Sequence, residues 1–143
     1  MIRPWRLSDT SQLIELCRAG AAEVYPQVEF DPEAIRRMAL DFYNDKTGRR
    51  VCFVADSGTE LVGSIAGTVQ PYFFSKELLM VETGFFLKKG NRGSGSKLLS
   101  ALEDQARRAG CRELVSFGPQ RATAFYKRAG FNVDGVNARK VLQ

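Results

Sequence analysis

The spacing of apolar positions predicts two helices in the first third of the chain. A short apolar strand over 1–7 precedes a first helix over about 9–18, where apolar residues recur at helical spacing. Residues 31–33 (Asp-Pro-Glu) supply a cap, a first-turn proline and an acidic residue, so we expect a second helix that ends near Asn44. The intervening stretch 20–30 has no clear period, which predicts a loop or a broken helix.

The middle of the chain changes to an extended pattern. Residues 51–55 and 61–69 are apolar runs joined by turn residues, which predicts a hairpin. The aromatic run 72–74 follows in a loop, where we expect a lid over the edge of the core, with a wall of a substrate site as the alternative. The stretch 78–87 is apolar on both faces apart from Glu82 and the threonine after it, so it is expected to be a central strand.

The last third of the chain alternates between helical and extended patterns. A helix through 98–109 carries its apolar residues on one stripe and stops at Gly110, which predicts a left-handed cap. A strand over 113–117 follows, so strand, helix and strand predict a parallel pair with a right-handed crossover. A helix over 121–129 and a last strand or hairpin over 131–142 complete the predicted elements.

Length and charge restrict the class of protein. The 143 residues contain no apolar run near the roughly 20 residues of a membrane span, and the N-terminus lacks the apolar stretch of a signal peptide. We therefore expect a cytoplasmic protein without membrane association. The net charge of +5 favours an anionic ligand or partner. Nucleic acid is not the expected partner, because the basic residues are dispersed and no stacking aromatic residues are interleaved with them on one strand.

The content of histidine and cysteine excludes several kinds of site. The chain has no histidine, which removes the Ser/His and Cys/His nucleophile arrangements and the commonest metal ligand. Cys17, Cys52 and Cys111 lie inside apolar patterns without metal-type spacing, so they are interpreted as reduced core residues and no metal site is expected. Proton transfer must then use Glu, Asp, Tyr, Lys or water.

The stretch 78–109 combines an apolar strand, a basic glycine-rich loop over 90–97 and an amphipathic helix. Consecutive backbone amides that lead into a helix N-terminus form a site for an anion. A nucleoside-triphosphate loop needs Lys directly after the last glycine and then Ser or Thr, but Ser96 intervenes and Leu98 follows the lysine. A dinucleotide fingerprint needs a third glycine three residues after the second, but this chain has Leu98 at that position. Both of these interpretations are weak.

Two separated stretches resemble the GNAT superfamily of acyl-coenzyme A dependent N-acetyltransferases. Residues 88–99 (KKGNRGSGSKLL) are similar to the coenzyme A pyrophosphate loop and the helix after it. Residues 121–131 (RATAFYKRAGF) are similar to the alanine, aromatic-tyrosine and glycine-phenylalanine signature of the family. The opening at 2–9 and the hairpin at 55–67 also resemble the family, so the likeness covers essentially the whole chain and looks most like small bacterial and phage-encoded members.

The resemblance implies a single GNAT-like domain over 1–143, of the α/β class, with a mixed sheet of about six or seven strands and about four flanking helices. It implies acetyl-coenzyme A as cofactor, with its pantetheine arm between splayed strands 78–87 and 113–117 and its thioester carbonyl polarised by a backbone amide of the first strand. The cofactor-binding residues implied in this way are Phe85, Phe86, Leu87, Arg92, Gly93, Ser94, Gly95, Ser96, Lys97 and Phe125.

The chain departs from the family pattern at two places. When the family pattern is aligned from the end of the strand at Leu87, Arg92 and Gly93 occupy the usual positions of its Arg-Gly pair. Leu98 and Leu99 then come about two residues earlier than in the family, as expected for a shortened loop. When the pattern is instead aligned backward from Leu98 and Leu99, Gly93 and Gly95 match the last two glycines of the family loop. In this second alignment Gly90 stands where the family has Gln or Arg. In addition, Pro119 stands where the family often has an asparagine that contacts the cofactor.

Acyl transfer to an amine needs a neutral amine, a polarised carbonyl and a proton for the leaving thiolate. Glu82 is the candidate base, directly or through water, because an acid in an apolar strand has a raised pKa; the alternative is an acid that faces solvent or pairs with an arginine. Tyr126 matches the family position of the acid that protonates the sulfur, and a core aromatic residue is the alternative.

The resemblance thus implies an acetyl-coenzyme A dependent N-acetyltransferase that acts on a primary amine of a small molecule or peptide by direct attack. A non-catalytic GNAT-fold protein that binds a macromolecular partner is the alternative. The acceptor stays open, and so does the oligomeric state, for which a homodimer is one candidate.

Overall fold

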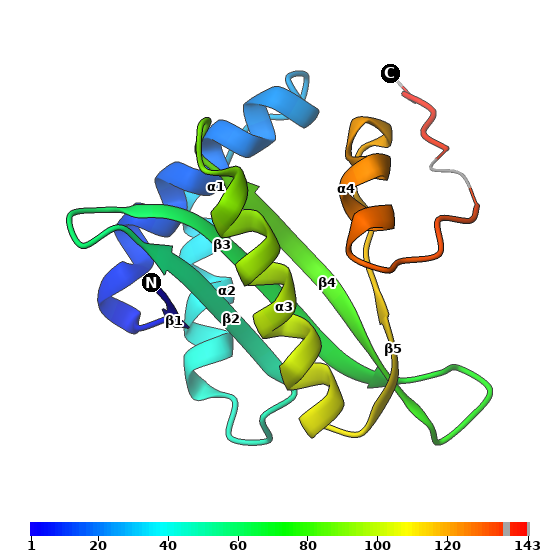
Figure 1. The fold of residues 1–143 in the computed structure, drawn as a ribbon. Helices are drawn as coiled ribbons and strands as arrows, with labels where there is room; N and C mark the ends of the chain where they lie inside the picture. Colours follow the sequence, from blue (N-terminus) through cyan, green and yellow to red (C-terminus); the bar gives the residue numbers. More distant parts are fainter. Residues whose placement is uncertain (136–137, 143) are drawn as a thin grey trace.

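The chain folds around one mixed β-sheet with helices on both of its faces (Figure 1). The computed structural model describes residues 1–135 and 138–142. The strands are β1 (Ile2–Pro4), β2 (Arg50–Asp56), β3 (Leu61–Pro71), β4 (Leu78–Leu87) and β5 (Cys111–Val115). The helices are α1 (Thr10–Val24), α2 (Pro32–Asn44), α3 (Arg92–Arg108) and α4 (Thr123–Arg128), with short 3-10 turns η1 (Leu7–Asp9) and η2 (Gln120–Ala122).

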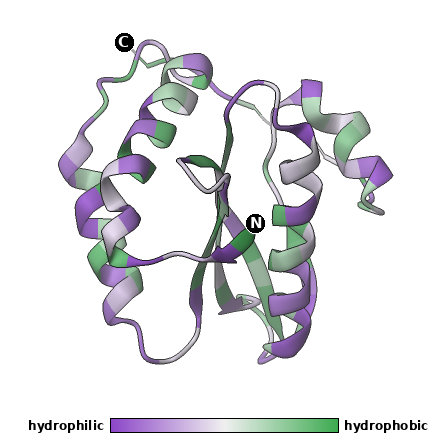
Figure 2. Cartoon of the chain, turned by 60° about the vertical axis from the view of Figure 1, so that its left-hand side comes forward, coloured by the Kyte–Doolittle hydropathy of each residue, from purple (hydrophilic) through white to green (hydrophobic). Residues whose placement is uncertain are grey.

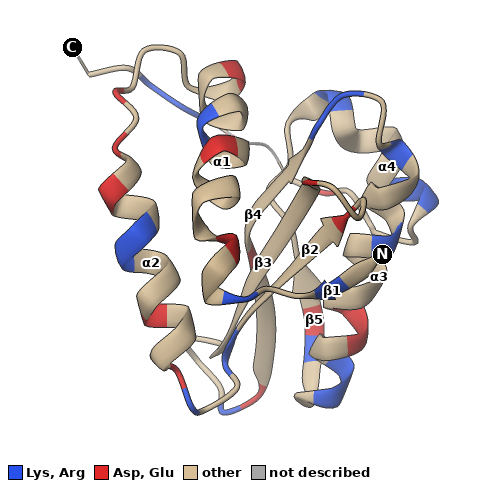
Figure 3. Ribbon diagram, turned by 90° about the vertical axis from the view of Figure 1, so that its left-hand side faces the viewer, with Lys and Arg blue, Asp and Glu red and all other residues tan. Residues whose placement is uncertain are grey.

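The strands lie in the order in which they occur along the chain. β1 to β4 pair antiparallel, and β5 returns parallel to β4 after the crossover through α3. α1 and α2 cover one face of the sheet and α3 covers the other (Figure 3). The predicted α/β class with a mixed sheet is confirmed, although the described residues form five strands instead of six or seven.

The core lies mainly between α3 and the sheet. Leu98, Leu99 and Leu102 of α3 pack against Ile65 and Met80, and each of these side chains is at most 1% exposed. A second cluster joins α1 to the other face. In Figure 2 the strands are hydrophobic and the outer faces of the helices are hydrophilic, as the amphipathic pattern predicted.

The first helix is longer than its apolar pattern predicted. α1 continues past residue 18 to Val24, because Gly20 leaves room for the ring of Phe86 on β4: a Cβ at Gly20 would lie 2.1 Å from a carbon of that ring. The second helix is confirmed, and its Asp31 cap accepts a hydrogen bond from the Glu33 amide at 2.9 Å. Contact with β4 therefore extends α1 through a stretch without periodicity of its own.

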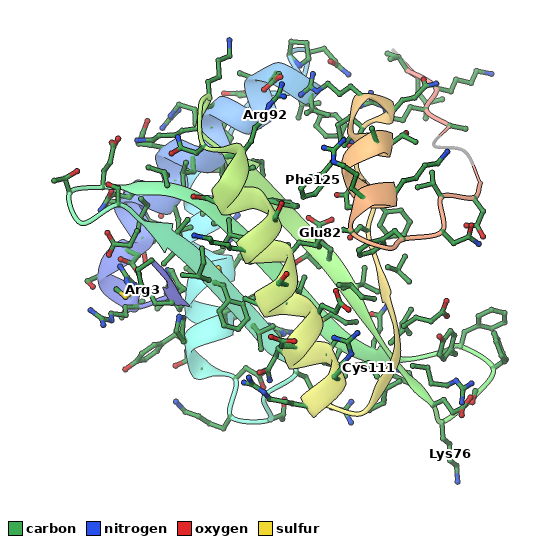
Figure 4. The ribbon with its side chains drawn as sticks, viewed as in Figure 1. Arg3, Lys76, Glu82, Arg92, Cys111 and Phe125 are labelled. Atoms are coloured by element: carbon green, nitrogen blue, oxygen red, sulfur yellow. The ribbon has the colours of Figure 1, made fainter. Side chains whose placement is uncertain are left out.

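The loop between β3 and β4 is not the predicted lid. Phe73 is 100% exposed and Phe74 is 73% exposed, so neither ring covers the core. The hairpin that contains them extends beyond the sheet, at the end where Lys76 is labelled in Figure 4. Its base is tied to β5, because the Tyr72 hydroxyl donates a hydrogen bond to Glu113 and the neighbouring Glu77 pairs with an arginine of β5 at 3.0 Å.

The C-terminal segment also differs from the prediction. The strand expected at 113–117 lies at Cys111–Val115, and the helix expected at 121–129 is divided into η2 and α4. The described residues of 131–142 contain no strand, so the predicted last strand is wrong for them; residues 136 and 137 lie outside the described part. Gly130 and Gly135 have left-handed φ angles of 88° and 78°, which turn the chain away from an extended course.

The N-terminal strand is joined to the fold by a nearly buried arginine. The Arg3 guanidinium pairs with Asp9 at 2.8 Å and with Asp56 at 3.0 Å, and thus links β1, η1 and β2. We expect Arg3→Ala to lower the free energy of unfolding by about 2 kcal/mol, because Asp9 loses its partner while it remains largely buried. The matched control Arg36→Ala, which breaks an exposed pair on α2, should change it by about 0.5 kcal/mol or less.

The pH dependence of this difference provides the check. Hydrogen bonds from Arg3 hold the pKa of Asp9 below its ordinary value, so their stabilisation is present above about pH 4 and is lost as the pH falls through the lowered pKa. Urea denaturation of both variants and the wild type at pH 7 and pH 3 should show the Arg3→Ala deficit shrinking at pH 3. An equal deficit at both pH values would contradict this account.

Candidate active site

β5, the edge strand of the sheet, separates from β4 about midway along β4. Their parallel pairing extends from Leu78 with Cys111 to Val81 with Val115, and β4 then continues for six residues without β5 beside it. In Figure 1 the chain after β5 turns away from β4 toward α4. The edge of β4 from Glu82 to Leu87 is therefore open on this side.

A bulge in β4 marks the point of separation. Glu82 pairs with Gly67 of β3 and Gly84 pairs with Ala66, so Thr83 is an extra residue without a partner across the strands. Bulges redirect side chains and end regular pairing, and they are common beside active sites. Glu82 thus follows directly after the last β4 residue that pairs with β5.

The open edge of β4 presents backbone groups of two predicted cofactor-binding residues. The Lys88 amide donates a hydrogen bond to the Val62 carbonyl at 2.8 Å. In an antiparallel pair of strands, every second residue forms backbone hydrogen bonds with the neighbouring strand, and the residues between them point their N–H and C=O groups to the other side. Phe86 is therefore bonded to β3, whereas the N–H and C=O groups of Phe85 and Leu87 point to the side that β5 has left. The Phe86 ring lies on the α1 face against Gly20, so the structure does not bring this predicted residue to the open edge.

A chain of aromatic rings connects β4 with α4. The rings of Phe85 and Phe125 lie 5.9 Å apart, and those of Phe125 and Tyr126 lie 5.4 Å apart, both in edge-on contact. Tyr126 also contacts Phe131 at 5.3 Å. Figure 4 shows Phe125 and Glu82 in the space between β4 and α4. The signature that the sequence placed at 121–131 therefore lies beside the open edge of β4.

Glu82 is a buried acid at this position. Glu82 is 8% exposed, and this burial raises the pKa of its carboxyl to about 7. The backbone amide of Phe117 stabilises the charged carboxylate and partly offsets the rise. No ion pair with Glu82 is found among the described residues, so the prediction of a raised pKa is supported over a solvent-facing or arginine-paired acid. A carboxyl with this pKa can accept or release a proton near neutral pH.

Tyr126 faces the same space from α4. Burial raises the pKa of its phenol to about 12; the charge of Glu82 adds to this rise and the Ser116 side chain opposes it. The charge of Glu82 acts on the Tyr126 phenol, so the structure brings these two predicted residues close together. A neutral phenol is thus the form present at physiological pH, and it can donate a proton or a hydrogen bond.

The predicted glycine-rich loop is shorter than expected, because most of it belongs to α3. The side-chain amide of Asn91 donates to the Lys88 and Lys89 carbonyls at 3.2 and 3.1 Å, and Gly90 takes a left-handed φ of 84°. This tight turn ends at Asn91, and α3 begins at Arg92. The prediction of a loop over 90–97 is therefore wrong for 92–97, which form the first turns of the helix.

The N-terminus of α3 has no side-chain cap. Arg92, Gly93 and Ser94 form its first turn, which also has no acidic residue. The Ser94 amide donates to the Asn91 carbonyl at 3.0 Å, whereas the N–H groups of Arg92 and Gly93 precede the helical ladder. Gly95 has a packing role, since a Cβ there would lie 2.8 Å from Leu87 and within 3.7 Å of Phe125. The helix therefore approaches the end of β4 and α4 closely.

The two remaining predicted cofactor residues lie elsewhere on α3. Ser96 and Lys97 line an open recess of about 410 Å³ between α3 and β1, and their N–H groups belong to the helical ladder. This recess contains neither Glu82 nor Tyr126, so it is separate from the candidate active site.

Positive charge gathers where β4 runs into α3 (Figure 3). Lys88 is neutralised by Glu60 at 2.6 Å. Lys89 and Arg92 have no ion-pair partner in the described chain, 1–135 and 138–142, and remain available to an anion.

A comparison with known proteins agrees with this geometry. The sequence pattern of the acetyltransferase (GNAT) family matches residues 12–131. The chain belongs to the GNAT acetyltransferase family. No curated protein matches the chain in a sequence comparison.

Solved structures share the GNAT fold along nearly the whole chain. Glucosamine-6-phosphate N-acetyltransferase from Arabidopsis thaliana is 15% identical, with a TM-score of 0.80 over 100% of this chain and 98% of its own. A transcriptional regulator from Bacillus halodurans C-125 is 21% identical, with a TM-score of 0.81 and 99% of both chains covered. The aminoglycoside N-acetyltransferase AAC(6')-Iy in complex with CoA is 16% identical, with a TM-score of 0.77 over 98% of this chain and 93% of its own. At these identities the likeness shows the fold.

The segment after β5 places further residues beside Glu82 and Tyr126 that sequence reasoning missed. Ser116 lies next to Tyr126, the Phe117 amide faces Glu82, and a Cβ at Gly118 would lie 2.4 Å from the Tyr126 ring. A polar residue and a glycine shortly after a predicted strand are the signal that could have indicated them. Pro119 caps η2, where its ring offers no side-chain amide to a cofactor.

Other kinds of site find no support in the described chain. Its residues contain no group of three or more His, Cys, Asp or Glu side chains that could hold a metal ion. None of its helices combines the length and the apolar composition that crossing a membrane requires. Burial raises the pKa of the Cys17 and Cys52 thiols to about 11 and 12, so neither is a thiolate at neutral pH.

Proposed function

We propose that this GNAT protein is an acetyl-coenzyme A dependent N-acetyltransferase that transfers an acetyl group to a primary amine by direct attack. The observation that carries the proposal is the meeting of Glu82 and Tyr126 where β4 and β5 separate. A carboxyl with a pKa of about 7 beside a neutral phenol supplies both the base and the acid that acyl transfer to an amine requires.

The residues around the open edge fit coenzyme A. The uncapped first turn of α3 suits its pyrophosphate, because the N–H groups of Arg92 and Gly93 and the helix dipole all favour an anion there. The free backbone groups of Phe85 and Leu87 suit an amide-containing arm that lies along β4 in place of the missing strand. Acetyl-coenzyme A supplies the acetyl group as a thioester.

Each catalytic residue then has one proton to move. The Glu82 carboxylate accepts a proton from the attacking amine, directly or through water, so that the nitrogen carries no excess charge when the amide forms. The Tyr126 hydroxyl gives its proton to the leaving sulfur. The Leu87 N–H at the open edge is the candidate donor to the carbonyl oxygen, where negative charge develops. No cysteine takes part as a nucleophile, because burial raises the pKa of the Cys17, Cys52 and Cys111 thiols and keeps them protonated at neutral pH.

The proposal is tested by calorimetric titration with acetyl-coenzyme A and by a thiol-release assay over amines, peptides and aminoglycosides. Binding together with thiol release that depends on the acceptor is the expected result. Absence of binding at millimolar acetyl-coenzyme A would contradict the proposal. In that case the alternative of a non-catalytic protein with a macromolecular partner gains support, and the fully exposed Phe73 is the first surface to test in a pull-down.

The charges at the start of α3 allow a matched test of the pyrophosphate site. Arg92→Ala is expected to raise the KM for acetyl-coenzyme A about tenfold, because it removes a cation that has no ion-pair partner among the described residues. Lys88→Ala is the control and should change KM about twofold or less, since Glu60 already neutralises this lysine.

Comparison with a truncated substrate separates this effect from general damage. S-acetylpantetheine lacks the pyrophosphate, so Arg92→Ala and the wild type should use it equally well. An equal loss with both substrates would contradict the assignment of Arg92.

A further inference from the structure

The segment 116–118 contacts both halves of the candidate catalytic pair. Ser116 lies beside the Tyr126 hydroxyl, and the Phe117 amide stabilises the charged form of Glu82. Gly118 packs closely against the hydroxyl end of the Tyr126 ring, because a Cβ there would lie 2.4 Å from ring carbon Cε2 and 2.9 Å from the hydroxyl oxygen. Three consecutive residues after β5 thus set the position of the phenol and the charge of the carboxyl.

The Ser116 hydroxyl is the unusual member of this segment. Its Oγ is buried, yet within the described residues it makes no hydrogen bond of ordinary geometry. It lies close enough to the phenol to oppose the rise in the pKa of Tyr126. Buried hydroxyl groups normally have a partner, so an unpaired hydroxyl beside a proposed proton donor needs an explanation.

We propose that Ser116 is a positioning residue that donates a hydrogen bond to the Tyr126 oxygen once that oxygen has lost its proton. The neutral phenol can donate its own O–H and is only a weak acceptor for a hydrogen bond from Ser116. The phenolate accepts hydrogen bonds strongly, and rotation about the Ser116 Cβ–Oγ bond can direct a proton to it. The hydrogen-bond partner of the unpaired Ser116 hydroxyl is therefore the ionised form of Tyr126.

The role of this bond in turnover rests on the proposed function. As the carbon–sulfur bond breaks, its electron pair stays on sulfur, which takes the proton from Tyr126 Oη. The electron pair of that O–H bond stays on the phenolate oxygen, and Ser116 stabilises its charge. The proton that Glu82 accepted from the amine then returns to the phenolate, directly or through water, so no other reactant is consumed.

Titration of Tyr126 tests the hydrogen bond without any need for activity. The tyrosines are replaced by 3-fluorotyrosine, whose lower intrinsic pKa brings the titration into a range that the folded protein tolerates. The ¹⁹F signal of Tyr126 is identified by its absence in Tyr126→Phe. Ser116→Ala should raise the titration midpoint by about one pH unit, and Ser116→Thr, which keeps the hydroxyl, should stay within about 0.3 unit of the wild type.

The electrostatic surroundings of Tyr126 must be held constant in this experiment. Glu82 on β4 is the one titratable group whose charge acts on the phenol in the described chain, and the rings of Phe125 and Phe131 are apolar. The titrations are therefore repeated in the Glu82→Gln background, where the same shift is expected. Near-ultraviolet circular dichroism of each variant confirms that the aromatic packing is intact.

Kinetics decide whether the bond matters for the reaction. Ser116→Ala is expected to lower kcat about tenfold with an unchanged KM for acetyl-coenzyme A, and Ser116→Thr should restore most of the rate. An identical titration midpoint in Ser116→Ala and the wild type would overturn the proposal, whether or not the protein transfers acetyl groups. A shifted midpoint with wild-type kcat would overturn the role in turnover. Failure of the wild type to use any amine contradicts the proposed function instead, and the fluorine titration still decides the hydrogen bond.

Discussion

Replacement of Glu82 by glutamine is expected to lower kcat by about 10²–10³-fold, because the variant keeps the shape of the side chain but cannot accept a proton. The KM for acetyl-coenzyme A should change little, since the first turn of α3 is untouched. The wild-type rate should rise with pH through an apparent pKa near 7, where burial has placed the Glu82 carboxyl, and this limb should be absent from the variant. Thiol release at saturating acetyl-coenzyme A, measured from pH 5 to pH 9, checks both expectations.

Stability gives a second measurement of the same residue that does not depend on activity. Burial raises the pKa of Glu82 from 4.5 to about 7, so the folded state holds one more proton than the unfolded chain between these values. Stability must then fall as the pH rises through this window, by about 3 kcal/mol for the whole shift. Glu82→Gln should therefore be more stable than the wild type at pH 8 and similar to it at pH 4.

The exposed Glu15→Gln on α1 is the matched control for charge removal, and it should change neither the rate nor the stability difference between pH 4 and pH 8. A Glu82→Gln variant with wild-type kcat would exclude Glu82 as the base. A wild-type stability that does not fall between pH 5 and pH 8 would show that the carboxyl is not held in its neutral form by burial.

Replacement of Tyr126 by phenylalanine is expected to lower kcat about 100-fold while the ring contacts with Phe125 and Phe131 are kept. The phenol lies on α4 within reach of the charge of Glu82, and without its proton the thiolate must leave unprotonated. The decisive measurement uses acetyl thioesters of increasingly acidic thiols. Because an acidic thiol leaves readily as the thiolate, the deficit of the variant should shrink steadily along the series.

Tyr43→Phe on the exposed face of α2 is the control and should leave the rate unchanged across the whole series. A Tyr126→Phe deficit that is equal for all leaving groups would mean that the phenol positions the substrate and does not donate a proton. That result would also remove the catalytic role inferred for Ser116, although it would not affect the assignment of Glu82.

Local signals in the sequence were sufficient for several elements. Residues 31–33 predicted the start of α2, and Gly110 predicted the end of α3, because a cap, a first-turn proline and a left-handed glycine each act within one turn of the chain. β4 was predicted with its correct bounds, since a strand covered on both faces is apolar throughout. Glu82 stood out against that background as the single acid.

Other elements depended on contacts that no local pattern shows. α1 extends past residue 18 because the Phe86 ring fills the space above Gly20. Phe73 and Phe74 remain in solvent because the β3–β4 hairpin extends beyond the sheet, although the same aromatic run elsewhere in the fold would cover a core. The helix after β4 begins at Arg92 because Asn91 closes a tight turn with the carbonyls of the two lysines before it.

The sequence by itself determined the α/β class, the family and the two residues, Glu82 and Tyr126, on which the proposed chemistry depends. The class and Glu82 follow from the pattern of apolar and charged residues, whereas the family and Tyr126 follow from the resemblance of short motifs to that family. Only the tertiary structure decided that β5 leaves β4 after Val81, that this opening joins Glu82 to Tyr126, and that Ser116 lies beside the phenol. The reason is physical: burial and neighbouring charges shift a pKa, and both are set by residues that are distant in the sequence and close only in the folded chain.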